Sequence, residues 1–136
     1  MYYLTVKTDF AAAHALRGYD GRCANLHGHN FTLDVTVKGS TLDGVGMLID
    51  FVELKRKVSC VLEEFDHRNL SEHPALAECN ATAEHIARYV CDHIACGLPD
   101  GVRVHSVTVH ETERACATYM PGEDPSGRPP RGPVLI

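Results

Sequence analysis

The stretch Cys23-Ala24-Asn25-Leu26-His27-Gly28-His29 places two imidazoles two residues apart, with a thiol four residues before the first. Side chains alternate between the two faces of a β-strand, so a strand that begins here points both histidines to one face. The residues that follow keep this alternation. The apolar set is Phe31, Leu33, Val35 and Val37, and the polar set is Asn30, Thr32, Asp34, Thr36 and Lys38. We therefore predict a strand over residues 27–39 with one buried face.

The first residues of the chain alternate in the same way and predict a strand over residues 2–12. Its apolar row is Tyr2, Leu4, Val6, Phe10 and Ala12. His14 continues that row in step. Only residues 15–25 separate the two segments, which favours antiparallel neighbours whose apolar faces coincide. His14 is then expected to meet His27 and His29 near one end of the sheet.

Histidines on an apolar face are costly to bury unless something pairs with them, and a bound metal is the simplest partner. Three imidazoles with an open fourth position are typical of a catalytic zinc site. Two alternatives stay open at this point. The histidines could be separate core or surface residues, or Cys23 could complete a closed site of one thiolate and three imidazoles.

Composition limits the class of protein. A chain of 136 residues with 44% hydrophobic and 23% charged residues is ordinary for one globular domain, and the net charge of −5 argues against a nucleic-acid binder. No apolar stretch is long enough to span a membrane, and the chain begins directly with a strand pattern in place of a signal peptide. We expect a cytoplasmic protein. Its six cysteines are then reduced thiols, and they form no Cys-x-x-Cys pair that would indicate a four-thiolate zinc site.

The rest of the chain predicts two helices and two further strands. Asp50 is typical of an N-cap, with Glu53 completing a capping box. Apolar residues at spacings of three and four then run from Phe51 through Leu54 and Val58 to Phe65. A second helix begins near Asn80 or Thr82, with Ile86, Tyr89 or Val90, and Ile94 on its buried face. It ends before Gly97 and Pro99. Residues 102–111 and 114–120 have strand patterns.

An antiparallel sheet of four strands with two helices on one face is an α+β domain, which we place over residues 1–120. Its long sheet edges would be exposed, which predicts association with other copies of the chain. Residues 121–136 hold five of the seven prolines and form a proline-rich C-terminal tail that cannot be helix or central strand.

Six short motifs between Phe10 and Tyr119 resemble a known family. They are Ala-Ala-His at 12–14, Cys-x-x-x-His-Gly-His at 23–29, Gly-Met-Leu-Ile-Asp-Phe at 46–51, Asp-His-Arg-Asn-Leu at 66–70, Asn-Ala-Thr-Ala-Glu at 80–84 and His-Glu-Thr at 110–112. Together they are similar to the 6-pyruvoyl-tetrahydropterin synthase superfamily. The spacing of three residues between the cysteine and His-Gly-His resembles that of the bacterial 6-carboxy-5,6,7,8-tetrahydropterin synthase branch, which acts in queuosine biosynthesis.

The resemblance implies a tunnelling fold and an oligomer. Three subunits would close their four-stranded sheets into a barrel, and two trimers would stack into a hexamer. Closure would remove the exposed edges. Active sites in this family lie between subunits, so groups that one chain lacks can come from another.

The resemblance also implies a reaction. The substrate would be 7,8-dihydroneopterin triphosphate, and the products 6-carboxy-5,6,7,8-tetrahydropterin, acetaldehyde and triphosphate. Zn²⁺ on His14, His27 and His29 would receive the substrate's side-chain hydroxyls and stabilise the negative charge that develops.

The remaining roles follow from the same resemblance. Cys23 would accept a proton as a thiolate, with His67 as its helper and Asp66 orienting that imidazole. Glu111 would grip the guanidine-like edge of the pterin with two acceptors and take part in proton transfer. Thr82 would make a second pterin contact.

Each of these residues also has a plain structural reading. Asp66-His67 could be a polar helix exit, Glu111 a solvated carboxylate at a strand end, and Thr82 an ordinary helix cap. Three rival functions remain beside the carboxy-forming lyase. They are a lyase that forms the pyruvoyl product with release of triphosphate, a non-catalytic zinc- and pterin-binding protein, and a structural zinc domain.

Overall fold

The structure, a computed structural model, describes residues 1–122, so most of the expected proline-rich tail lies outside the described residues. Two long strands dominate it: β1, Tyr2–His14, and β2, His27–Gly39. They pair antiparallel in the register Tyr2↔Gly39 to His14↔His27. The prediction of a strand over 27–39 is confirmed, and the first strand extends two residues further than predicted, as far as His14.

The sheet has five strands in the order β3-β1-β2-β4-β5. Strands β4, Arg103–Thr112, and β5, Ala115–Tyr119, continue the antiparallel pairing beyond β2. The fifth strand is β3, Arg68–Asn69, which pairs in parallel with Ala12 and Ala13 of β1. The four-stranded expectation missed β3, because two residues are too short to show an alternating pattern.

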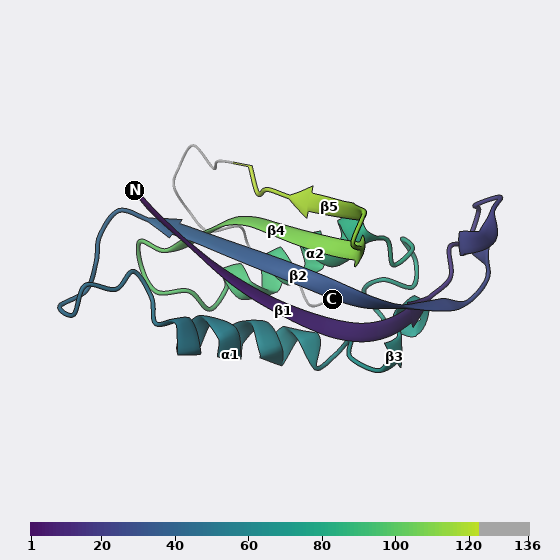
Figure 1. Cartoon of the computed structure of the whole chain (residues 1–136), viewed down its shortest axis with the longest axis horizontal. Coiled ribbons are helices and arrows are strands. Elements are labelled where there is room, and N and C mark those ends of the chain that lie inside the picture. The colour runs from purple at the N-terminus through teal and green to yellow at the C-terminus, as the bar shows by residue number, and fades with distance from the viewer. Residues whose placement is uncertain (123–136) are drawn as a thin grey trace.

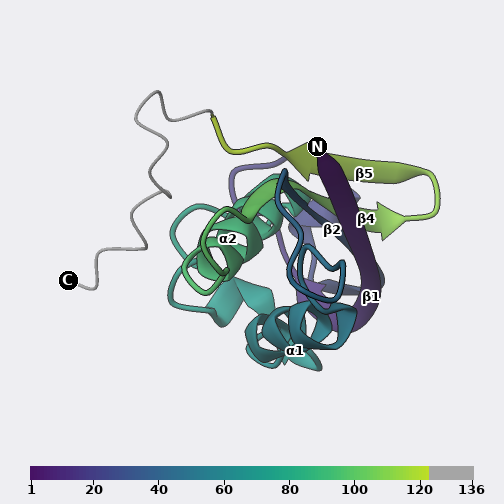
Figure 2. The same ribbon diagram turned by 90° about the vertical axis from the view of Figure 1, so that its left-hand side faces the viewer.

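Helices α1, Phe51–Leu62, and α2, Ala83–Ala95, both lie on one face of the sheet (Figures 1 and 2). This confirms the α+β class. Two short 3₁₀ turns complete the described chain, η1 at Arg22–Ala24 and η2 at Leu70–Glu72. No helix among residues 1–122 is both long and apolar enough to cross a membrane. All six cysteines are free thiols.

The core lies between the sheet and the helices. Every second residue of each strand fills it from the sheet side, among them Phe10, Phe31 and Leu33. The helices contribute Leu54, Val58, Leu62, Ile86, Val90 and Ile94. Phe51 was predicted to be buried but is 50% exposed. Leu48 and Ile49, which come just before α1, are buried and fill the core where the helix begins.

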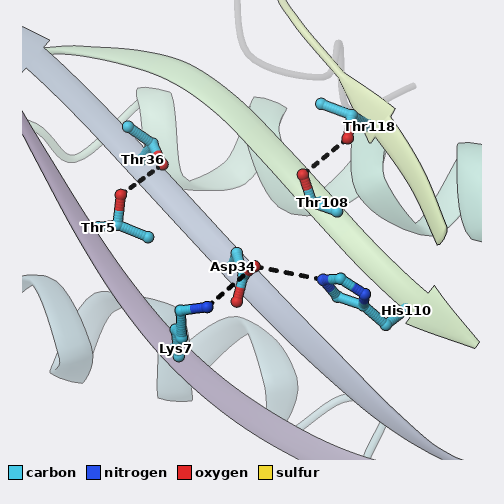
Figure 3. A network of polar contacts seen from close by, with 7 residues as sticks. All are labelled: Thr5, Lys7, Asp34, Thr36, Thr108, His110 and Thr118. Carbon is cyan, nitrogen blue, oxygen red and sulfur yellow. Dashed lines mark hydrogen bonds and ion pairs between the residues drawn. The ribbon is translucent and has the colours of Figure 1, made fainter. Parts of the chain in front are cut away.

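The face of the sheet away from the helices is polar (Figure 3). Thr5 bonds to Thr36 across β1 and β2, and Thr108 bonds to Thr118 across β4 and β5, each with 2.7 Å between the hydroxyl oxygens. Between them, Asp34 accepts a hydrogen bond of 3.2 Å from Nε2 of His110 and lies 3.6 Å from the Lys7 ammonium. One face of the sheet is therefore core and the other can meet water.

Asp50 caps α1, since its Oδ1 accepts the Val52 N–H at 2.7 Å. The capping box is not completed within the described chain. Glu53 instead pairs with Lys57 one turn on, at 3.5 Å.

Asp50→Ala is expected to destabilise the fold by about 1 kcal/mol, because the first turn of α1 loses its side-chain acceptor. Urea unfolding monitored by circular dichroism measures this. Lys55→Ala on the exposed face of α1 is the matched control, with a change within about 0.5 kcal/mol. Equal stability of the two variants would show that the cap contributes nothing.

Candidate metal centre

Three histidine rings converge at one end of the β1–β2 pair. The ring centroids of His14, His27 and His29 lie 4.6 to 5.2 Å from one another. Strand alternation and the His14↔His27 register put all three on the helix-facing side. His14 is 1% exposed, and the Nε2 atoms of all three rings are buried without a hydrogen-bond partner.

Backbone carbonyls fix two of these rings. Nδ1 of His14 donates to the carbonyl oxygen of Ala81 at 2.7 Å, and Nδ1 of His27 donates to that of Asn25 at 2.6 Å. A carbonyl only accepts, so the proton of each neutral ring lies on Nδ1 and its Nε2 carries a free lone pair. A histidine that ligates a metal commonly donates its other ring nitrogen to such an acceptor.

The electrostatics favour a neutral His29. Burial is the largest cause that lowers its pKa; Glu111 opposes the shift, and His14 and His27 add to it. A neutral imidazole is the form that binds a metal.

Glu111 joins the same cluster from β4. Its Oε1 lies 3.1 Å from Nε2 of His29, and the ligand atoms of Glu111 and the three histidines all lie within 4.8 Å of one another. These four residues form the metal-capable group of the described chain. Buried, unpartnered nitrogen lone pairs beside a carboxylate fit a divalent cation, and imidazole suits zinc.

The connection between β1 and β2, residues 15–26, is tied down at its base. Ala15 donates its N–H to Oγ of Ser71 at 2.9 Å and accepts from that hydroxyl at 3.1 Å. Arg17 makes the same kind of pair with Asn80, whose Oδ1 accepts at 3.0 Å and whose Nδ2 donates at 2.9 Å. Asn80 has φ of +67°, which asparagine tolerates better than most residues.

The Asn80 side chain therefore holds the connection of residues 15–26, which contains Cys23. The next residue, Ala81, supplies the carbonyl that accepts from His14. Within the Asn-Ala-Thr-Ala-Glu motif, the sequence indicated a ligand contact only for Thr82 and considered Asn80 only as a possible helix start. The signal available was the asparagine itself, a residue typical of left-handed backbone.

Asn80→Ala is expected to destabilise the protein by about 2 kcal/mol, because it removes two hydrogen bonds and leaves a β-carbon strained at positive φ. Asn80→Gly removes the same bonds without the strain, so it should cost about 1 kcal/mol less. We also expect both variants to bind zinc about tenfold more weakly, through the displaced Ala81 carbonyl. Denaturant unfolding and chelator competition measure the two effects, and wild-type values in both would contradict this role.

Cys23 lies in η1, half-buried, and its carbonyl accepts from Leu16 at 2.9 Å. Its thiol is not among the atoms of the metal-capable group. The structure thus gives no support to a closed site with Cys23 as fourth ligand.

Asp66 and His67 follow α1 and lie beside β1. Oδ1 of Asp66 lies 3.0 Å from Nδ1 of His67 and also accepts the Ala11 N–H at 3.0 Å. The Ala11 bond first, and then His67, lower the pKa of Asp66, so the carboxylate is ionised. The His67 side chain is 81% exposed, with φ of +58°, and no hydrogen bond joins it to Cys23 within residues 1–122. One chain alone does not bring this pair to the thiol.

Thr82 is the N-cap of α2. Its Oγ1 accepts the His85 N–H at 3.3 Å and also lies 3.2 Å from Nδ1 of His85. The side chain is therefore engaged within its own chain, which leaves backbone groups for any contact with a ligand.

A hollow of about 520 Å³ lies where β1, β2 and β3 meet. His29 and His67 both line it, together with Asn30 and Arg68. The hollow therefore lies beside the exposed His67 residue and the end of β2.

Comparison with known proteins agrees with this fold. The family profile of 6-pyruvoyl tetrahydropterin synthase matches residues 3–122. The solved structure of Caenorhabditis elegans 6-pyruvoyl tetrahydropterin synthase superposes with a TM-score of 0.75 at 29% identity, covering 90% of this chain and 98% of that one.

Two archaeal relatives carry other names. A protein of Archaeoglobus fulgidus, provisionally named a 6-carboxy-5,6,7,8-tetrahydropterin synthase, is 35% identical over 108 residues, 79% of this chain and 86% of that protein. The dihydroneopterin monophosphate aldolase of Pyrococcus furiosus is 36% identical over 105 residues, 77% of this chain and 85% of that protein.

The superposition agrees with the helix-backed sheet of this chain, and the family profile covers nearly all of the described residues. The chain belongs to the 6-pyruvoyl tetrahydropterin synthase family.

Proposed function

We propose that this protein converts 7,8-dihydroneopterin triphosphate and water to 6-carboxy-5,6,7,8-tetrahydropterin, acetaldehyde and triphosphate, in 7-deazapurine and queuosine biosynthesis. The observation that carries this is the convergence of three buried Nε2 atoms without hydrogen-bond partners in a member of a pterin synthase family. The three-residue gap between Cys23 and His27 favours the carboxy-forming branch.

His14, His27 and His29 would hold Zn²⁺. When bound, the ion acidifies hydroxyls at its remaining position and stabilises developing negative charge. Glu111 offers a carboxylate beside that position for the N–H groups of a pterin, and Thr82 heads the segment that can meet its edge through the backbone.

Cys23 would be the proton acceptor, and it needs a neighbouring base to become a thiolate. We propose that this base is His67 of an adjacent subunit, since the His67 ring is exposed and the Asp66 carboxylate already orients it. The arrangement of base and orienting acid is the usual one for an activated thiol.

The assembly would be a hexamer, with three sheets closed into a barrel and two trimers stacked. The polar outer face of the sheet would line the barrel, and the edges at β3 and β5 would be covered. Light scattering during gel filtration is expected to give about six times the chain mass of 14.9 kDa. A monomer at micromolar concentration would contradict this assembly.

Product identification tests the reaction. Purified zinc-loaded protein is incubated with 7,8-dihydroneopterin triphosphate, and the products are identified by mass. We expect acetaldehyde and the carboxy product in equal amounts. A product that retains a diketo side chain, without acetaldehyde, would instead identify the pyruvoyl-forming lyase. That is the activity for which the similar Caenorhabditis elegans protein is named.

A parallel incubation with dihydroneopterin monophosphate covers the activity for which the Pyrococcus furiosus relative is named. Turnover of the monophosphate but not of the triphosphate would contradict the proposed synthase reaction and indicate an aldolase instead. No turnover of either substrate, with pterin binding retained, would indicate a non-catalytic zinc- and pterin-binding protein. A structural zinc domain would unfold on chelation, whereas a catalytic site should lose activity before its fold.

A further inference from the structure

Glu111 lies in direct contact with the histidine cluster, since its Oε1 is 3.1 Å from Nε2 of His29. Glu111 continues the core-facing row of Val107 and Val109 on β4. Because His110 pairs with Thr32 of β2, Glu111 lies beside Phe31. His29 is the next residue of β2 on the same face. The carboxylate thus enters the metal-capable group from a neighbouring strand.

The contact between the two side chains is not a hydrogen bond. Oε1 of Glu111 and Nε2 of His29 lie 3.1 Å apart, yet Nε2 has no hydrogen-bond partner. Two ligand atoms on one tetrahedral zinc ion lie roughly 3.4 Å apart, since each bond is about 2.0 to 2.2 Å long. The observed separation is close to that edge length, as expected for two groups arranged around one cation.

We propose that Glu111 is a fourth protein ligand of the metal in the substrate-free protein and leaves the metal when a pterin binds. This rests on the proposed function, because it assumes the three-histidine metal site. The carboxylate neutralises part of the charge of the ion and keeps small anions from its fourth position. A pterin edge offers it two N–H donors instead, which makes exchange possible. The Glu111 side chain is 28% exposed, so part of it already faces solvent.

Cobalt substitution tests the proposal, because the visible spectrum of Co²⁺ responds to its ligands. Wild type, Glu111→Gln and Glu111→Ala are loaded with Co²⁺ and compared, with Glu113→Gln as a control that changes the same charge at an exposed position two residues on. We expect both Glu111 variants to shift the absorption bands and to bind zinc about tenfold more weakly in chelator competition. Azide should perturb their spectra at concentrations that leave the wild type and Glu113→Gln unchanged.

Identical spectra, affinities within twofold and equal azide sensitivity would overturn the role of Glu111 while leaving the three-histidine site intact. Failure of the wild type to bind Co²⁺, or binding that persists unchanged in His27→Gln, would overturn the metal site itself. The two failures are therefore distinguishable.

Discussion

His27→Gln is expected to lose bound zinc and at least a hundredfold of turnover, because the change removes one of three nitrogen ligands. His27 is the informative choice among the three histidines. His14 is 1% exposed and contacts Ala81, so its loss would also disturb the core, whereas His27 is partly exposed near the end of the sheet. Zinc per chain by plasma mass spectrometry should fall from about one to near zero while the circular dichroism spectrum is unchanged.

His105→Gln is the matched control, since it makes the same substitution on β4, where His105 contacts the Tyr3 ring at a centroid distance of 4.9 Å. It should keep both zinc and turnover. Full zinc content and full turnover in His27→Gln would refute the three-histidine site.

Cys23→Ala is expected to keep zinc and lose turnover by a factor of about 10² to 10⁴, the usual contribution of a positioned proton acceptor. The thiol lies outside the metal-capable group, so its removal should leave the ligand set complete. Cys60→Ala, which removes an exposed thiol of α1, should behave as wild type. A Cys23→Ala protein that loses zinc along with activity would show that the sulfur is a ligand.

Complementation between chains tests where His67 acts. Cys23→Ala and His67→Ala are each expected to be inactive as pure assemblies. If Cys23 and His67 of one site come from different chains, co-expression of the two variants at equal amounts should restore about a quarter of the sites, since random mixing gives each intact residue half the time. No restored activity would place both residues in the same chain.

Much of the fold could be predicted from alternation and capping. His14 continues the apolar row of the first strand, as His27 and His29 do in the second, and this predicted one cluster because strand side chains repeat every second residue. Asp50 was correctly placed at a helix start, and Thr82 was the correct one of two predicted starts, because their short oxygen-bearing side chains satisfy first-turn N–H groups.

The rest depends on contacts that no local pattern encodes. The carbonyls of Ala81 and Asn25 that orient the rings are backbone atoms, which any residue would supply. The clamp between Asn80 and Arg17 joins residues far apart in the chain. The approach of Glu111 to His29 depends on the register between β2 and β4, and the proposed base for Cys23 would come from a second subunit.

Anomalous diffraction at the zinc absorption edge, from crystals of the purified assembly, tests the three-histidine site most directly. We predict one anomalous peak per chain, within about 2.2 Å of Nε2 of His14, His27 and His29. Absence of a peak there, or a peak bonded to the Cys23 sulfur with the three rings apart, would contradict it.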